Sequence, residues 1–122
     1  MEIGIGIHGE PGRRRAKLAP ANEITEMLAI PVIDDLGLKS GDRVLAFVNG
    51  MGGSPLIELY IAFNSVSKIL GAKGVTIRRS LVGNYITSLE MAGFSVTLLR
   101  LDDEMTRLWD AQVHTPALRW GL

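Results

Sequence analysis

The stretch 41-GDRVLAFVNGMGGSPLIELYIAFNSVSKIL-70 decides the fold of this 122-residue chain. A turn at Gly41 leads into an apolar run from Val44 to Val48, which is typical of a buried strand. After a short glycine-rich turn, apolar residues recur at helical spacing, with Ser54 as the expected N-cap and Pro55 as the first helical residue. A strand that passes through such a turn into an amphipathic helix is the building unit of an α/β domain.

The segments on either side continue this alternation. The order strand, helix, strand, helix, strand, turn-rich segment, strand, helix predicts one α/β domain over residues 1–122, with helices mainly on one face of the sheet. Pro31 is expected to kink or split its helix, and residues 82–91 carry mixed signals that leave room for one more strand. We expect strands at 2–7, 44–48, 75–80 and 94–101, helices at 20–36, 55–70 and 103–109, the last capped by Asp102, and an irregular tail over 111–122.

The composition excludes several classes of function. Thirteen basic and 13 acidic residues cancel, so no net field would attract nucleic acid or an anionic membrane. The chain has no cysteine, which excludes a disulfide scaffold and a thiolate metal site. No apolar run approaches the length of a membrane span, and the N-terminus resembles no signal segment. A cytoplasmic protein without a membrane anchor is the expectation that remains.

The stretch 4-GIGIHGEPG-12 holds the first candidate for chemistry. His8 follows a glycine-rich strand, and an imidazole that is uncharged at neutral pH offers a lone pair as base, ligand or nucleophile. Gly6 and Gly9 leave space for a substrate, and Glu10 is placed to accept a proton from the other ring nitrogen and so fix the tautomer. The alternatives are a loop histidine bonded to its own turn and a solvated glutamate.

Other motifs are weaker. Gly4, Gly6 and Gly9 match G-x-G-x-x-G, but no helix follows, so nucleotide binding is not expected there. Three further motifs each have a functional interpretation and a simpler structural one. "GMGGSP" is an anion-binding nest or a tight turn, Arg13–Arg15 contact a phosphate or form a solvated surface, and Asp102 and Asp103 bind magnesium or cap a helix. His114 is assigned a structural role.

Four ordered motifs together carry a resemblance that covers essentially the whole chain. The sequence is similar to the C-terminal domain of the substrate-binding K subunit of dihydroxyacetone (glycerone) kinases. The resemblance implies a two-layer α/β fold on a mixed sheet. The motifs are "GIGIHGEPG" (4–12), "SGDRV" with "VNGMGGSPLIELY" (40–60), "GNYITSLEMAGFSVTLLRLDD" (83–103) and "DAQVHTPALRWG" (110–121).

The resemblance also implies a mechanism. In this family the histidine of "HGEPG" forms a covalent hemiaminal with dihydroxyacetone, whose hydroxyl is then phosphorylated. His8 would be that nucleophile, Gly6 and Gly9 would line its approach, and Glu10 would orient its ring. The N-terminal half of a K subunit, which supplies an acid/base His and Asp, is missing, so this chain alone is not expected to transfer a phosphoryl group.

The resemblance implies partners as well. No cofactor or metal is expected on this chain, because ATP or ADP and Mg²⁺ would be held by a nucleotide-binding L subunit, which many bacteria recharge by a phosphoenolpyruvate-dependent relay. K subunits pair as homodimers. Two alternatives remain: a non-catalytic dihydroxyacetone-binding regulator of transcription, and a structural half that dimerises and presents a surface to the L subunit.

Overall fold

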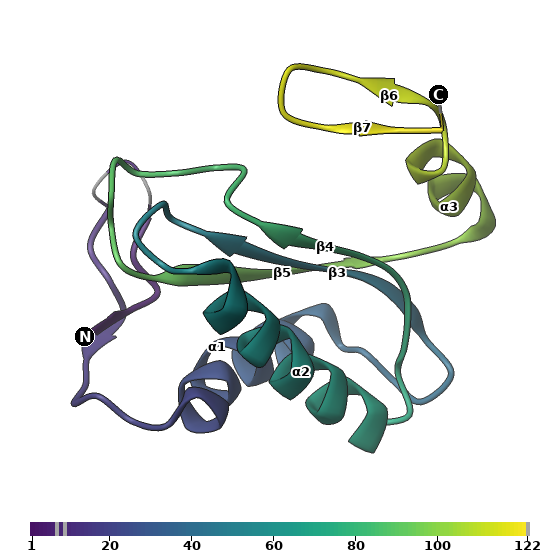
Figure 1. Ribbon diagram of the computed structural model, residues 1–122. Coiled ribbons are helices and arrows are strands. Elements are labelled where there is room, and N and C mark those ends of the chain that lie inside the picture. The colour runs from purple at the N-terminus through teal and green to yellow at the C-terminus, as the bar shows by residue number, and fades with distance from the viewer. Residues whose placement is uncertain (7, 9, 122) are drawn as a thin grey trace.

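The fold is seen in a computed structural model, which describes residues 1–6, 8 and 10–121. Figure 1 shows the sheet with two long helices on one side and the C-terminal segment on the other. In chain order the elements are β1 (Glu2–Ile3), β2 (Arg14–Arg15), α1 (Ala21–Leu36), β3 (Arg43–Gly50), α2 (Leu56–Ala72), β4 (Thr76–Gly83), β5 (Phe94–Arg100), α3 (Asp103–Trp109), β6 (Val113–His114) and β7 (Arg119–Trp120).

β3 is the central strand of a three-stranded sheet with the order β4-β3-β5. It runs parallel to β4, with Val48 opposite Val82, and antiparallel to β5, with Val48 opposite Val96. The sheet is therefore mixed. α1 and α2 lie side by side against one of its faces. These findings confirm the α/β class, the mixed sheet and the placement of the helices.

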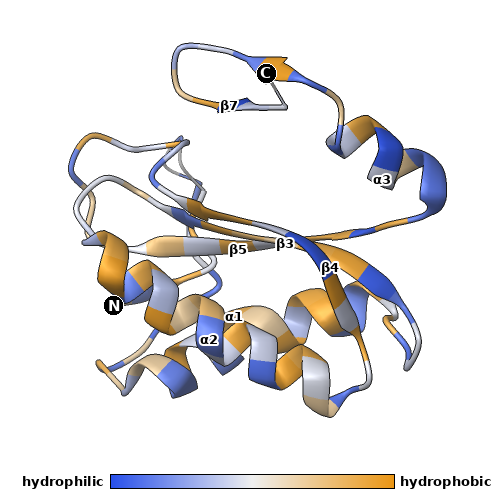
Figure 2. Ribbon diagram, turned by 45° about the vertical axis from the view of Figure 1, so that its right-hand side comes forward, coloured by the Kyte–Doolittle hydropathy of each residue, from blue (hydrophilic) through white to orange (hydrophobic). Residues whose placement is uncertain are grey.

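The core lies between the sheet and the two helices. Alternate β3 residues point to this side, because successive side chains of a strand face opposite ways. Burial of each large aliphatic side chain stabilises the fold by about 1.5–3 kcal/mol. Figure 2 shows both helices alternating between hydrophobic and hydrophilic residues, as helices buried along one side do. The fully buried core residues include Val44, Ala46, Val48, Leu59, Val66, Leu70, Ala29 and Ile33.

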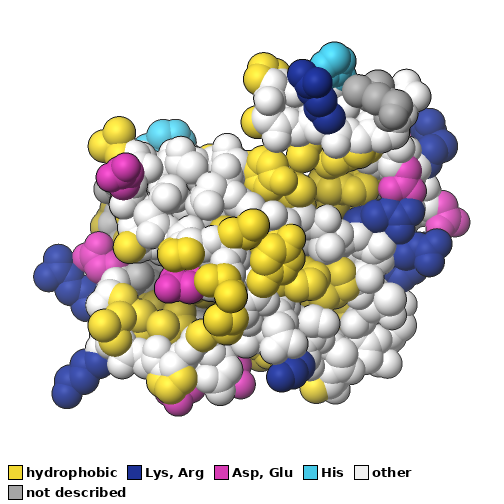
Figure 3. Space-filling model, in the orientation of Figure 1, with side chains coloured by type: hydrophobic (Ala, Val, Ile, Leu, Met, Phe, Trp, Pro, Cys, Tyr) yellow, Lys and Arg dark blue, Asp and Glu magenta, His cyan; other side chains and the backbone are white. Residues whose placement is uncertain are grey.

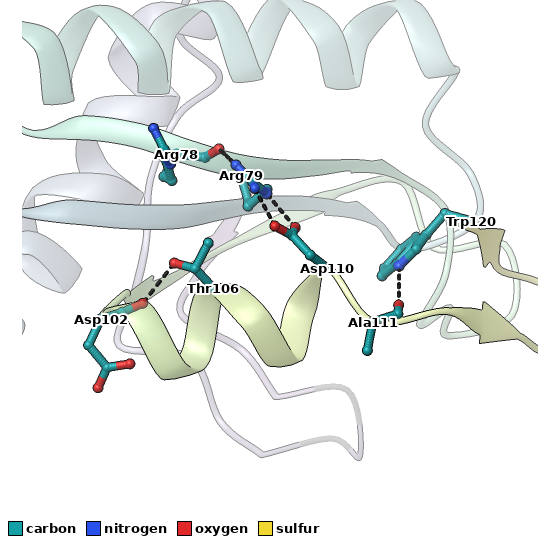
Figure 4. A network of polar contacts seen from close by, with 7 residues as sticks. All are labelled: Arg78, Arg79, Asp102, Thr106, Asp110, Ala111 and Trp120. Atoms are coloured by element: carbon teal, nitrogen blue, oxygen red, sulfur yellow. Dashed lines mark hydrogen bonds and ion pairs between the residues drawn. The ribbon is translucent and has the colours of Figure 1, made fainter. Parts of the chain in front are cut away.

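The C-terminal segment lies on the opposite side of the sheet (Figure 1). Asp102 caps α3 as expected, since its carboxylate accepts a hydrogen bond from the Met105 N–H at 2.7 Å. After α3, Arg79 of β4 donates two hydrogen bonds to the Asp110 carboxylate (Figure 4). The rings of Trp109 and Trp120 lie 5.0 Å apart.

The prediction of an irregular tail is wrong. β6 and β7 form a two-stranded antiparallel hairpin, in which Val113 lies opposite Trp120. The Trp120 indole N–H donates to the Ala111 carbonyl at 2.7 Å (Figure 4). Each strand has only two residues, too few for a period-2 pattern to be recognised in the sequence. The contacts of the Trp120 indole, rather than a long strand pairing, stabilise the hairpin.

Four local predictions need correction. Within residues 1–6, the described part of the predicted strand 2–7, regular strand structure covers only Glu2–Ile3, since Gly4 has a φ of 75° and ends β1. α1 is not split at Pro31 but continues to Leu36. α2 begins at Leu56 with Pro55 at its N-cap position, one residue later than predicted, and no side chain caps it. Residues 82–91 add no further strand, because β4 simply continues to Gly83 and a single isolated bridge joins Gly52 to Met91.

No helix among the described residues combines the length and hydropathy needed to cross a lipid bilayer.

Candidate functional site

A surface cleft of about 560 Å³ lies between two segments that are far apart in the sequence. One segment is the loop that joins β1 to β2, and the other is the connection from β4 to β5. Figure 1 shows these two segments side by side at one end of the sheet. The cleft is lined by Glu2, Ile5, Gly6, Glu10, Pro11, Gly12, Arg14, Arg15, Ser88 and Met91.

The His8 side chain is not among the residues that line this cleft, but it contacts one of them, Glu10. It is 81% exposed, and its Nδ1 lies 3.3 Å from Oε1 of Glu10, which lines the cleft. The same carboxylate accepts a hydrogen bond from the His8 backbone N–H at 3.1 Å, through Oε2. A carboxylate bound in this way favours the tautomer with the proton on Nδ1, which leaves the lone pair on Nε2. Nε2 makes no hydrogen bond to the described residues.

Gly6 makes room for this arrangement. A Cβ at position 6 would collide with the Glu10 carboxylate, so a larger residue would push Glu10 away from His8. The Gly6 N–H also donates to the Glu10 carbonyl at 3.2 Å, which closes the loop. Gly9, the other glycine expected beside the substrate, lies outside the described residues.

The electrostatics of the loop favour an ionised Glu10. Its pKa is lowered from the ordinary value of 4.5, chiefly by a hydrogen bond from its own backbone N–H. The backbone N–H and the ring of His8 lower this pKa further, while partial desolvation opposes them. The carboxylate is therefore a hydrogen-bond acceptor at neutral pH, as the Nδ1–H tautomer of His8 requires.

The opposite wall of the cleft belongs to the segment from Asn84 to Gly93, which carries Ser88 and Met91. It is joined to the turn after β3 at several points, for example by the Ser88 N–H to the Met51 carbonyl at 3.0 Å. Neither Ser88 nor Met91 was predicted from the sequence as a site residue. The only available signal was the polar Asn49 at the end of the buried apolar strand 44–48, because a buried amide needs hydrogen-bond partners.

The "GMGGSP" turn is not an anion-binding nest. The backbone N–H groups of Met51, Gly52 and Gly53 all donate to protein oxygens, those of Gly93, Asn84 and Met91 respectively. Ser54 Oγ bonds to both the N–H and the carbonyl of Gly93. The alternative interpretation, a tight connection between strand and helix, is the one that the structure supports.

The remaining candidates are dispersed. Arg14 and Arg15 line the cleft, and Arg15 pairs with Glu2 at 2.9 Å. Asp102 caps α3, Asp103 pairs with Arg43 at 3.0 Å, and His114 lies in β6. Within residues 1–6, 8 and 10–121, no group of three or more His, Cys, Asp or Glu side chains is arranged to hold a metal ion.

The mixed sheet with helices on one face, and the exposed histidine beside an open cleft, define an α/β domain with a candidate small-ligand site at one end of its sheet. The model of the Dak1 domain matches residues 1–117. The chain belongs to the Dak1 domain family.

Three known proteins illustrate the relationship. The chain is 45% identical over 116 residues to the dihydroxyacetone-binding subunit DhaK of PTS-dependent dihydroxyacetone kinase 2 from Listeria innocua, covering 95% of this chain and 35% of that protein. It is 42% identical over 125 residues to L-erythrulose 1-kinase from Mycolicibacterium smegmatis, covering 99% of this chain and 22% of that protein. The solved structure of the dihydroxyacetone kinase operon co-activator Dha-DhaQ superimposes with a TM-score of 0.83 at 31% identity, covering 89% of this chain and 34% of that one. The chain thus spans about a third or less of these relatives.

Proposed function

We propose that this chain is the dihydroxyacetone-binding domain of a dihydroxyacetone kinase and that His8 holds the ketone covalently. The observation that carries the proposal is the His8 ring, which is 81% exposed and has its Nδ1 within 3.3 Å of the Glu10 carboxylate. The names of the Listeria and Mycolicibacterium relatives support a ketone as the ligand.

The chemistry is an addition to a carbonyl. The Nε2 lone pair of the neutral imidazole forms a bond to the carbonyl carbon, and the π electron pair of the C=O bond moves to oxygen, which takes a proton from water. The Nδ1 proton leaves toward the Glu10 carboxylate and then to solvent. The product is a neutral hemiaminal, and no oxidant or reductant is needed.

This addition separates ketones from alcohols. Glycerol differs from dihydroxyacetone only by having an alcohol where the ketone carries its carbonyl, so hydrogen bonds alone would discriminate weakly between them. An imidazole adds to a carbonyl carbon and cannot add to an alcohol carbon. The covalent bond therefore selects the ketone before any phosphoryl transfer takes place.

The rest of the reaction belongs to other polypeptide regions. The phosphoryl group would come from ATP and Mg²⁺ on a nucleotide-binding L subunit. The acid/base groups would come from a region corresponding to the part of the Listeria relative that this chain does not match. The reaction would belong to glycerol metabolism in the cytoplasm.

A homodimer is consistent with the exposed surface of α2. Figure 3 shows hydrophobic side chains gathered over the face that α2 presents. Ile57 of α2 is 70% exposed and Tyr60 53%.

A regulatory module is the second candidate. It is favoured by the structural match to the co-activator Dha-DhaQ, at a TM-score of 0.83. A chimera in which this chain replaces the matching 116 residues of the Listeria subunit separates the two candidates. Formation of dihydroxyacetone phosphate by the chimera, with its nucleotide-bearing partner and the phosphoenolpyruvate-dependent relay that recharges it, supports the kinase. Ketone binding without turnover supports the regulator.

The covalent step is tested by native mass spectrometry of the chain with dihydroxyacetone. We expect a mass increase of one ketone molecule in the wild type and in His114→Ala, a matched variant at the other, exposed histidine. We expect no increase in His8→Ala or with glycerol. An adduct of equal abundance in His8→Ala would exclude His8 as the nucleophile.

A further inference from the structure

The three-stranded sheet has two edge strands, β4 and β5, which differ in how their outer edges are protected. The pairing of β4 with β3 is irregular and skips Arg78, and the neighbouring Arg79 is bound to Asp110 of the C-terminal segment. Bulges and charged side chains are common devices that keep an edge strand from pairing with other chains. The edge of β4 is therefore protected.

The edge of β5 lacks such devices. Its sequence, FSVTLLR (94–100), contains no proline, pairs with β3 in an unbroken register and carries a charge only at Arg100. The Arg100 guanidinium is engaged elsewhere, since it donates to the Leu36 carbonyl at the end of α1 at 2.7 Å. A long, regular and largely apolar edge is a template for pairing with another strand.

The backbone of β5 has unused hydrogen-bonding groups. In an antiparallel pair, the N–H and C=O groups of every second residue point toward the partner strand, and those of the residues between point away. The Leu101 N–H donates to the Arg43 carbonyl at 2.8 Å, and this contact sets the phase of the pairing. The backbone groups that point away from β3 are consequently those of Phe94, Val96 and Leu98. They make no hydrogen bond within the part of the chain that the structure describes.

A groove lies beside the first half of β5. A cavity of about 250 Å³ separates this strand from α1 and from the segment that follows β1. Two further hollows adjoin it, because all three share Arg13 and Pro31 as lining residues. The lining of the cavity is mostly apolar and includes Ile3, Met27, Leu28, Val32, Phe94 and Val96.

The edge and the groove together specify the chemistry of an occupant. Unpaired N–H and C=O groups at every second residue are complemented by another extended backbone, and an apolar groove suits apolar side chains at every second position of that backbone. Because α1 and the segment after β1 flank the edge, the groove fits a single extended segment better than the sheet of a second copy. The family also contains polypeptide that can supply such a segment, since this chain covers 35% of the Listeria subunit and 34% of the co-activator Dha-DhaQ.

We propose that the outer edge of β5 binds an extended apolar segment from the region of Dak1-family proteins that this chain does not match, and that this segment adds to the sheet as a further strand. Val96 and Leu98 supply the backbone hydrogen bonds, and Met27 and Val32 of α1 contact alternate side chains of the added strand. The inference does not rest on ketone binding, so its failure would leave the proposed function intact.

The test uses overlapping peptides of about ten residues, the length of a long strand, that cover the unmatched part of the Listeria subunit. Each peptide is titrated onto the isotope-labelled chain, and amide hydrogen exchange is followed by NMR. At least one peptide should slow exchange at Val96 and Leu98 by about tenfold or more. The amides of Thr97 and Leu99 face β3 and serve as the internal reference. If no peptide slows Val96 and Leu98, or if a peptide protects β4 instead, the proposal is wrong.

Backbone methylation of the responding peptide distinguishes strand addition from binding through side chains alone. N-methyl groups on one alternate set of its residues remove the N–H groups that face β5 and should abolish binding. N-methyl groups on the other set point away from β5 and should leave binding largely intact. Equal affinities of the two methylated peptides would show that no strand is added.

A pair of α1 variants tests the groove. Met27→Lys should weaken binding of the responding peptide by about tenfold, because it places a charge against an apolar segment. Asn22→Lys adds the same charge at an exposed position of α1 and should bind the peptide as the wild type does. Equal affinities of the two variants would overturn the assigned groove.

A second copy of the chain is the alternative occupant. If it binds this edge, Val96 and Leu98 become protected as the chain alone is concentrated, and the mass measured by analytical ultracentrifugation doubles in parallel. That result would overturn the proposal. Exchange at Val96 and Leu98 that is independent of chain concentration supports it.

Discussion

His8 and Glu10 are bound to each other twice, through the backbone N–H of His8 and through its ring. One Glu10 oxygen lies 3.1 Å from the His8 backbone nitrogen, and the other lies 3.3 Å from Nδ1. Two contacts across two residues hold the ring in one orientation although it is 81% exposed. The carboxylate thereby selects which ring nitrogen carries the lone pair.

Glu10→Gln should weaken dihydroxyacetone binding by about three- to tenfold. The amide oxygen still accepts a hydrogen bond, but a neutral acceptor favours the Nδ1–H tautomer less than a carboxylate does. The affinity is measured by titration, and the tautomer by the nitrogen chemical shifts of His8. Glu26→Gln, an exposed change on α1, is the matched control, and equal affinities in the two variants would contradict this role of Glu10.

Glu10 should titrate below its ordinary pKa of 4.5. A carboxylate with a lowered pKa stabilises the folded loop above pH 4.5, and this contribution is lost as the pH falls through the lowered pKa. Carbon NMR of the carboxyl group measures it directly. In His8→Ala the pKa should rise but stay below 4.5, because the backbone N–H groups at positions 8 and 10 remain. A wild-type midpoint at or above 4.5 would contradict the geometry.

The parts of the fold that depend on neighbours in sequence were predictable. The buried strand 44–48 lies within β3, and α3 has the predicted bounds because Asp102 caps it locally. The pair of His8 and Glu10 was also recognisable, because its members are two residues apart. Their roles in catalysis remain predictions.

The parts that depend on distant contacts were not predictable. Ser54 has the residue type and position of an N-cap, but its hydroxyl bonds to Gly93, which is 39 residues away in sequence. Asn49 bonds to backbone groups 36 and 37 residues away. The polarity of Asn49 indicates that it needs hydrogen-bond partners, but a single sequence does not show which residues they are, so the second wall of the cleft became apparent only in the structure.

Ser54→Ala should destabilise the connection at Gly93 and not the start of α2. It removes the acceptor of the Gly93 N–H and the donor to the Gly93 carbonyl, at a cost of about 1–3 kcal/mol in the free energy of unfolding. Hydrogen exchange should accelerate at Gly93 while the first amides of α2 keep their rates. Ser65→Ala, which removes a hydroxyl bonded inside α2, is the control. Faster exchange confined to the first turn of α2 would restore the N-cap interpretation.

Asp110→Asn should reduce the acid sensitivity of the fold. The pKa of Asp110 is lowered from 3.8, first by its hydrogen bond from Arg79. By the same linkage, this pair stabilises the protein above pH 3.8 and the contribution disappears as the pH falls through the lowered pKa. Urea unfolding at neutral and acid pH should therefore show a smaller pH dependence in Asp110→Asn. Asp35→Asn removes the same charge from the exposed surface of α1 and should retain the wild-type dependence.

Two glycine-to-alanine changes should have opposite effects on stability. Gly52 has a φ of 111°, and a Cβ there would collide with the Leu89 carbonyl of the cleft wall. Gly52→Ala should lower the free energy of unfolding by about 2 kcal/mol or more and weaken ketone binding, because it pushes the wall away from the turn. Gly71, inside α2, has nothing within 4 Å of its Cβ position, so Gly71→Ala should stabilise the helix by about 0.5 kcal/mol. Urea unfolding measures both, and a Gly52→Ala protein as stable as Gly71→Ala would show that the turn does not support the wall.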